Sequence, residues 1–539
     1  MTNGTFPTAT RRDFLRLTTA LGAAMTFAGT LSACGTSPAD RADGSAESAA
    51  AGNPDGTITT AISYELGTNG FDPMTTSAAL TVAANWHTME GLTEVLPSGT
   101  REIYPALAKE LPKKVDEHTW EATLREGAKF HDGSPVTAED VVFSFERVLD
   151  PKNQSLYVQF ISFLDGVTAK DDKTITFKLK APFSLVPQRL AVVKIVPKAL
   201  VSKDAKAFDA KPVGSGPWKL TDNSATSKQL AFERFDDYNG SRPAKAAKMV
   251  WKVMPDDSTR INAMSSKAVQ AIDQVPDLSV ETLKANAKVE AVQGFSLLFA
   301  MFNVGSAPFK EVRNRQAFLY ALDMDKIIKT AYLDNASPAT SFLHETHPDY
   351  KKAKTVYSYD VGKAKALFKE TGLSSIRLLC TDHGWVKKAT PIIKECLEAA
   401  GLKVDFTEKK SADVYNTIDG KPAAYDAVIA PGDPSVFGSD PSLLLRWWYS
   451  NETWTDNRMH WKGQPSHKKV QELLDKAESQ EGEEQKATWG ELFDLISETV
   501  PLYPLLHRKP STAWDDSSLV DFKPISLTGL SLIDVASTK

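Results

Sequence analysis

Cysteine and histidine are scarce in this sequence. Its 539 residues include three cysteines and nine histidines. Three cysteines cannot make a disulfide framework, although Cys380 and Cys396 could pair outside the cytoplasm if their geometry allows it. His344 and His347 lie three residues apart, but Pro348 and the lack of a third ligand favour a solvated loop. The sequence therefore predicts no metal site.

Motifs that mark common catalytic sites are also missing. The chain contains no G-x-S-x-G, H-E-x-x-H or C-x-x-C motif and no Walker loop. The G-x-G at Gly214 is not followed by a helix with the spacing that nucleotide binding requires. We therefore expect a protein that is not an enzyme and has no cofactor. A net charge of −5, spread along the chain, argues against nucleic acid as the main partner.

Long apolar runs are absent after the first 33 residues. Leu17–Ala33 carries no acid or base, is marginal for a membrane span and is typical of an export signal. Arg11 and Arg12 precede it and resemble a twin-arginine signal. Leu31–Gly35 resembles a bacterial lipobox, in which Cys34 becomes the first mature residue and carries a lipid. The alternative is a plain signal peptide with an accidental cysteine.

The residues after Cys34 are mostly small or polar and predict a flexible tether. We therefore expect a signal peptide over residues 1–33 and a tether over residues 34–54. The mature protein is expected on the extracytoplasmic face of the bacterial cell membrane, exported by the twin-arginine route and anchored to the membrane through the lipid on Cys34.

The rest of the chain is long enough for two or three domains and mixes strands with helices. Period-two alternation predicts strands at residues 57–64, 174–179, 229–235 and 248–255. Side chains that can cap a helix precede several amphipathic runs, namely Thr137, Asp323, Asp360 and Ser466. This interleaving predicts an α/β or mixed fold.

Four stretches carry a family resemblance. Lys129–Pro135 reads K-F-H-D-G-S-P, and Lys211–Trp218 reads K-P-V-G-S-G-P-W. Phe302-Asn303 ends an expected strand ahead of a P-F pair and a helix, and Val500–Leu505 reads V-P-L-Y-P-L. These motifs resemble the family-5 solute-binding proteins, which serve ABC importers of peptides, nickel complexes and related solutes. The resemblance extends over residues 56–539.

The resemblance implies an α/β fold with two lobes, a hinge between them and an extra domain inserted in the first lobe. Carried onto this chain, lobe I covers residues 55–98, 212–303 and 508–539, the insert covers 99–211, and lobe II covers 304–507. It also implies a monomer that captures a peptide or peptide-like solute between its lobes and delivers it to an ABC permease. Lys129–Pro135 is then scaffold in the insert.

Asp433 is the candidate for the main contact with the solute. In peptide-binding members, an aspartate after the corresponding strand, here Tyr425–Ala430, pairs with the α-ammonium of the peptide. Asp440 is an alternative position for that residue. A second alternative is that Asp433 only shapes a turn.

Aromatic side chains near this loop complete the candidate site. Trp447 and Trp448 cannot both face one way on a regular element, so we expect one in the core and one in the cleft. Trp385, Trp86 and Asn303 are the remaining candidate contacts. No arginine occurs near Trp385 to hold a ligand carboxylate as in dipeptide-binding members, which argues against strict dipeptide specificity.

Other functions stay open at this point. An exported hydrolase acting on peptides and a receptor that presents its solute to a signalling protein would share the same location. Within the family, nickel chelates, haem and oligosaccharides are alternative solutes.

Overall fold

Three main sheets and the helices around them form the part of the chain that the computed structural model describes, which is residues 52–65, 70–76, 78–99, 101–224 and 226–539. The predicted signal peptide, Cys34 and the tether up to residue 51 lie outside the described residues. Among the helices of these described ranges, none combines the length and apolar character needed to cross a bilayer.

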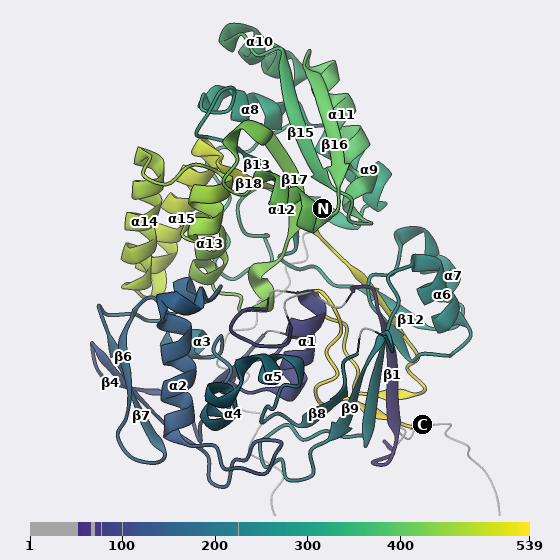
Figure 1. The fold of residues 1–539 in the computed structure, drawn as a ribbon. Coiled ribbons are helices and arrows are strands. Elements are labelled where there is room, and N and C mark those ends of the chain that lie inside the picture. The colour runs from purple at the N-terminus through teal and green to yellow at the C-terminus, as the bar shows by residue number, and fades with distance from the viewer. Residues whose placement is uncertain (1–51, 66–69, 77, 100, 225) are drawn as a thin grey trace, which may run out of the picture. The chain divides into compact units, whose positions relative to one another are not determined.

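The first sheet has seven strands and joins segments from both ends of the chain (Figure 1). Its order is β12-β19-β11-β1-β10-β9-β8, and β1 pairs in parallel with β10 and β11. The strands are β1 (Thr57–Ile62), β8 (Trp218–Asp222), β9 (Gln229–Arg234), β10 (Lys248–Val253), β11 (Ala271–Ile272), β12 (Lys288–Ala291) and β19 (Ser511–Trp514).

Alternation along β1 explains how both faces of this sheet are covered. Ile58 and Ile62 pack into the cluster that includes helix α1 (Ala79–Thr88), whereas Ala61 packs with Met264 of α6 (Asp257–Ser265) on the other face. Successive strand residues point to opposite faces, so one strand contributes to two cores.

The second sheet has four strands in the order β4-β5-β7-β6, namely β4 (Lys113–Asp116), β5 (Thr119–Thr123), β6 (Leu164–Ala169) and β7 (Thr174–Leu179). Helix α2 (Ala138–Leu149) packs on it. The predicted cap at Thr137 is confirmed and forms a full capping box, because Thr137 accepts from the Asp140 amide while the Asp140 carboxylate accepts from the Thr137 amide.

His131 joins two of the family motifs. Its Nδ1 accepts a hydrogen bond from the Gly214 amide at 3.2 Å, so Nε2 carries the proton and donates to the Gly216 carbonyl at 2.9 Å. The adjacent Asp132 accepts from the amide and hydroxyl of Ser134 and closes the turn. These contacts give both motifs a structural role.

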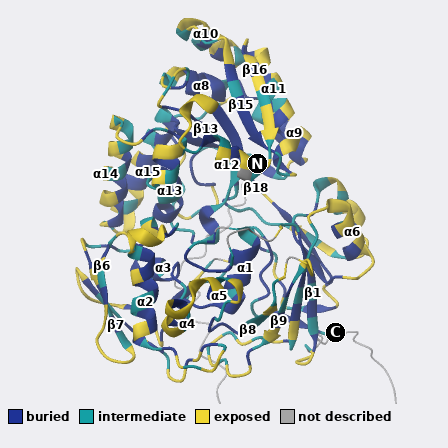
Figure 2. Cartoon of the chain, viewed as in Figure 1, coloured by how far each residue is buried: buried dark blue, intermediate teal, exposed yellow. Residues whose placement is uncertain are grey.

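The third sheet has six strands in the order β14-β18-β13-β17-β15-β16, and its central strands are buried (Figure 2). The strands are β13 (Leu297–Phe302), β14 (Ala336–Pro338), β15 (Ser375–Thr381), β16 (Lys403–Lys409), β17 (Ala427–Gly432) and β18 (Leu502–Arg508). The helices of this region are α8 (Val312–Tyr320), α9 (Met324–Tyr332), α10 (Val361–Thr371), α11 (Thr390–Ala399), α12 (Ser411–Ile418), α13 (Pro441–Tyr449), α14 (Pro465–Glu478) and α15 (Gly482–Thr499).

Two crossings connect the seven-stranded sheet with the six-stranded sheet. The chain leaves β12 and enters β13 through residues 292–296, and it returns from β18 to β19 through residues 509–510. The crossings are hydrogen-bonded to each other, since the Arg508 amide donates to the Ser296 carbonyl at 2.7 Å and the Val292 amide donates to the Pro510 carbonyl. β13 thus lies in the six-stranded sheet, although the expected range of lobe I runs to residue 303.

Candidate ligand-binding site

Asp433 stands directly after β17, the strand predicted to carry it. Its Oδ1 accepts hydrogen bonds from the amide of Ser435 at 3.2 Å and from the hydroxyl of Ser435 at 2.5 Å. The preceding residue must be glycine, because a Cβ on Gly432 would lie 2.6 Å from the Trp448 ring. Asp433 therefore does shape a turn, and that turn is packed against a tryptophan.

The second carboxylate oxygen of Asp433 is not used by the turn. Oδ2 is buried and has no hydrogen-bond partner among the described residues. Burial raises the pKa of the Asp433 carboxyl from 3.8 to about 6, while the hydrogen bonds from Ser435 and the charge of Arg101 oppose that rise. A buried carboxylate with a free oxygen is an expensive arrangement that a cation would relieve.

Arg101 is a neighbour of Asp433 that sequence reasoning missed. It lies between β2 (Thr93–Val95) and β3 (Ile103–Pro105), in a left-handed backbone conformation with φ of 59°. Its Nη2 donates to the Ser435 carbonyl at 2.5 Å, across 334 positions of sequence. Arg101 therefore holds the loop after β17 from outside the six-stranded sheet. Its positive charge also favours the ionised form of the Asp433 carboxyl.

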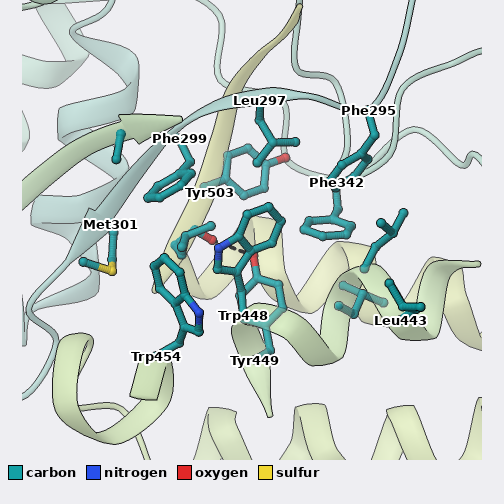
Figure 3. Close-up of a cluster of buried hydrophobic side chains, with 14 of the residues drawn as sticks. Phe295, Leu297, Phe299, Met301, Phe342, Leu443, Trp448, Tyr449, Trp454 and Tyr503 are labelled. Atoms are coloured by element: carbon teal, nitrogen blue, oxygen red, sulfur yellow. Dashed lines mark hydrogen bonds between the residues drawn. The ribbon is translucent and has the colours of Figure 1, made fainter. Parts of the chain in front are cut away.

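A cavity of about 290 Å³ opens beside Asp433, and we call it the tryptophan pocket. Trp447, Trp448 and Trp454 line it together with Asp433. Trp448 is fully buried and packs edge-on against Phe299 and Trp454 (Figure 3), whereas Trp447 is half-buried. One tryptophan of the adjacent pair is therefore in the core, as expected, and both border the same cavity.

A stacked cation forms another wall of the tryptophan pocket. The Arg458 guanidinium lies 4.0 Å from the ring centre of Tyr415 and 4.4 Å from that of Trp454. Its Nε donates to Asp419 at 2.7 Å. Because the charge of Arg458 is already paired and stacked, this wall offers ring surface rather than a free cation.

Trp385 lies in a different cavity, of about 420 Å³, which we call the Trp385 pocket. Tyr64, His383 and Arg508 also line it. The Arg508 guanidinium lies 4.6 Å from the ring centre of Trp385, and the rings of Tyr64 and His383 are 5.6 Å apart. The Trp385 pocket therefore combines side chains of the six-stranded sheet region, including the last residue of β18, with side chains of the segment after β1.

The other predicted contacts are dispersed. Trp86, on α1, lines a small cavity of about 40 Å³ that also touches Arg101. Asn303 is buried and donates to the carbonyls of Pro422 and Tyr425. It does not line the cavity at Trp86, the tryptophan pocket or the cavity at Trp385. The structure thus gives Asn303 a role in holding the approach to β17.

Asp440, the alternative to Asp433, already has a cationic partner. Its Oδ1 accepts from Arg189 at 2.8 Å in a pair that is buried on both sides, and it also caps α13 through the Leu443 amide. Asp440 is therefore one partner of a structural ion pair.

The structure answers one open question about unusual side chains and corrects one expectation. Cys380 and Cys396, whose pairing the sequence left open, are both buried and are not joined to each other. The expectation of a solvated loop at His344 and His347 was wrong. His344 is buried rather than solvated, and Nε2 of the half-buried His347 lies 2.7 Å from the Ser439 carbonyl. Within the described ranges, no cluster of three or more His, Cys, Asp or Glu side chains could hold a metal ion.

Solved structures with similar architecture define the class of fold. The binding protein AgaA of A. tumefaciens, in complex with agropinic acid, matches with a TM-score of 0.79 over 89% of this chain and 99% of that chain, at 25% identity. The fold is therefore the two-lobed α/β fold of periplasmic binding proteins, as the sequence predicted.

Residues 102–488 match the family described as bacterial extracellular solute-binding proteins, family 5, and this chain belongs to that family. A glutathione-binding protein, GsiB, of Pectobacterium atrosepticum is 29% identical over 329 residues, which cover 59% of this chain and 63% of the relative. A dipeptide-binding protein of Escherichia coli is 28% identical over 331 residues, covering 56% and 61%. The matches thus span about three fifths of these curated relatives.

Proposed function

We propose that this chain is the extracytoplasmic solute-binding component of an ABC importer, and that it binds a peptide or peptide-like solute through an ammonium group at Asp433. The free, buried Oδ2 of Asp433 carries the proposal, because a cation from the solute would relieve the cost of that charge. The relatives named above are called glutathione-binding and dipeptide-binding proteins, which supports a solute of this class.

The tryptophan pocket supports a bulky side chain on the solute. It is continuous with Asp433 and is walled by the rings of Trp447, Trp448 and Trp454. Aromatic walls accept many apolar groups without demanding one hydrogen-bond pattern, and a cavity of about 290 Å³ has room for a large one. We place the solute's first side chains here.

We place the hinge at the two crossings, residues 292–296 and 509–510, and the lobes at the ranges expected from the resemblance except for β13. Closure of two lobes about such crossings is a hinge motion that buries the solute. In this proposal the protein is a monomer, exported by the twin-arginine route, anchored through a lipid on Cys34 and partnered by permease subunits. Loss of membrane association in Cys34→Ala, at unchanged solute affinity, is the expected outcome.

Calorimetry with blocked peptides tests the binding mode. A free-amine peptide such as Met-Leu is expected to bind, whereas its N-acetyl derivative is expected to lose at least tenfold in affinity because it has no cation for Asp433. Equal affinity for the two would contradict the proposal. Recovery of the peptide unchanged after incubation is expected of a binding protein, and hydrolysis would favour the exported-hydrolase alternative.

A further inference from the structure

The segment between β17 and α13, residues 433–440, separates two cavities, and we call it the dividing loop. The tryptophan pocket lies on one side, and a cavity of about 520 Å³, the large cavity, lies on the other. Because a cavity lies on each side, packing alone does not fix the position of this loop, and specific contacts must do so. Asp433, Pro434, Val436 and Phe437 line the tryptophan pocket, whereas Ser435, Gly438, Ser439 and Asp440 line the large cavity.

Two contacts hold the end of the dividing loop that leads into α13. Arg189 pairs with Asp440 at 2.8 Å, and both side chains are buried. Nε2 of His347 lies 2.7 Å from the Ser439 carbonyl. This end of the loop is therefore anchored independently of its beginning at Asp433.

At the beginning of the dividing loop, a chain of hydrogen bonds runs from Arg101 through Ser435 to Asp433. Nη2 of Arg101 donates to the Ser435 carbonyl at 2.5 Å. The amide and hydroxyl of the same serine donate to Oδ1 of Asp433. Ser435 is 2% exposed, so water has little access to compete for these contacts. Arg101 therefore fixes the residue that orients the Asp433 carboxylate.

The charge of Arg101 also acts on Asp433. Burial lowers the pKa of the Arg101 guanidinium to about 10, and the negative charge of Asp433 opposes that shift. In return, the positive charge of Arg101 lowers the pKa of the Asp433 carboxyl. Arg458, a second cation at the tryptophan pocket, is paired with Asp419. Arg101 thus favours the ionised carboxylate that an ammonium group requires.

We propose that Arg101 is a positioning residue of the solute site, which acts through Ser435 to hold the Asp433 carboxylate in place for the ammonium of the solute. The insert then takes part in solute binding, because Arg101 lies within residues 99–211, the range expected for it. This inference rests on the proposed function. It adds that the Asp433 site is complete only when the turn after β2 meets the dividing loop.

Calorimetry with Met-Leu gives the first test. Arg101→Ala is expected to bind Met-Leu about tenfold more weakly than wild type, because the carboxylate loses its fixed orientation and its neighbouring cation. Arg101→Lys keeps the charge and one donor for the Ser435 carbonyl, so it is expected to recover part of the loss. Unchanged affinity of a folded Arg101→Ala would overturn the inference and leave the proposed function intact. Failure of wild type to bind Met-Leu would overturn the proposed function, and the inference with it.

A double-mutant cycle separates positioning from a purely structural role. In the Asp433→Asn background, Arg101→Ala is expected to weaken Met-Leu binding by less than about twofold, because the group through which Arg101 acts has lost its charge. An equal loss in both backgrounds would assign Arg101 a structural role and overturn the inference.

The pH profile gives a second readout of the same kind. Without the cation, the Asp433 carboxyl takes up its proton at a higher pH, so the affinity of Arg101→Ala for Met-Leu is expected to fall at a higher pH than that of wild type. Arg101→Lys is expected to keep the wild-type profile. A midpoint that does not move in Arg101→Ala would contradict the assignment.

Arg315→Ala is the matched control. Arg315, on α8, likewise donates to backbone carbonyls, and burial lowers its pKa to about 10 as it does for Arg101. It does not line the tryptophan pocket or the large cavity. Arg315→Ala is expected to lower stability without changing the affinity of the folded protein for Met-Leu. A loss of affinity as large as that of Arg101→Ala would show that the assay follows stability, and the inference would fall.

Discussion

Replacement of Asp433 by asparagine should lower the affinity for the solute and raise the stability of the solute-free protein at neutral pH. The asparagine side chain keeps an acceptor oxygen of the same shape in place of Oδ1, so the hydrogen bonds from Ser435 can be kept. What Asp433→Asn removes is the charge on the free Oδ2. A hydrogen bond to a charged group contributes about 1.5 to 3 kcal/mol, so affinity for a free-amine peptide should fall by roughly tenfold to more than a hundredfold.

The effect on stability follows from the raised pKa of Asp433. A carboxyl whose pKa is about 6 in the folded protein and 3.8 otherwise binds its proton more tightly when folded, so stability is lost as the pH rises from about 3.8 to 6. A shift of about two units corresponds to about 3 kcal/mol. Solute-free Asp433→Asn should therefore be more stable than wild type at pH 7.5, by at most about this amount, and equal to it near pH 4.

The assay is calorimetric titration with Met-Leu, paired with urea unfolding of the solute-free protein at pH 7.5 and pH 4. The matched control is Asp440→Asn, since Asp440 follows the same strand but already pairs with Arg189. Loss of one partner of a buried ion pair is expected to destabilise the protein by about 3 to 5 kcal/mol, without changing the affinity of the folded fraction.

Two results would refute this reasoning. If Asp433→Asn binds the free-amine peptide as tightly as wild type, Asp433 only shapes the turn. If the variant is destabilised at pH 7.5 by more than at pH 4, the buried charge stabilises the solute-free protein and needs no cation from a solute.

Three further predictions concern the pH and the core. Wild-type affinity for a free-amine peptide should fall about tenfold between pH 7.5 and pH 5, because protonation of Asp433 removes the charge, and a flat profile by calorimetry would contradict this. Trp448→Ala should cost about 3 to 5 kcal/mol of unfolding free energy in urea, and Trp447→Ala, at a half-buried position, clearly less; equal losses would be inconsistent with their burial. Thr137→Ala should cost about 1 kcal/mol through the lost cap of α2 at unchanged affinity, and no thermal shift would argue against the cap.

Elements fixed by local interactions could be predicted from the sequence. Alternation predicted residues 174–179 as a strand, and β7 has those bounds. Asp360 accepts from the Lys363 amide at the start of α10, as expected, and Gly372, the residue type that favours a left-handed C-cap, ends the helix in that conformation. Each signal lies within the segment that it organises, so no distant partner can alter it.

Ser466 shows where such a local signal fails. α14 begins at Pro465 after Gln464, and no side chain caps it. The Ser466 hydroxyl accepts instead from the indole Nε1 of Trp461 at 2.8 Å. A buried tryptophan N–H needs an acceptor, and here that need takes precedence over capping.

The candidate site was only partly predictable. Asp433 and its tryptophan neighbours follow one strand, so a resemblance in that strand identifies them together. Arg101 comes from a turn and Arg508 from the end of β18, both far from Asp433 along the chain, and their contacts exist only once the sheets are assembled. The one sequence signal for Arg508 is its place at the end of the strand that contains the V-P-L-Y-P-L motif. Likewise, burial of His344 depends on packing that its own segment does not encode.

Mass spectrometry of the small molecule that co-purifies with native protein tests the central claim most directly. The account predicts one solute per protein molecule with a primary amine, retained by wild type and lost from Asp433→Asn under the same purification. A solute without an amine, or one retained equally by Asp433→Asn, would contradict it.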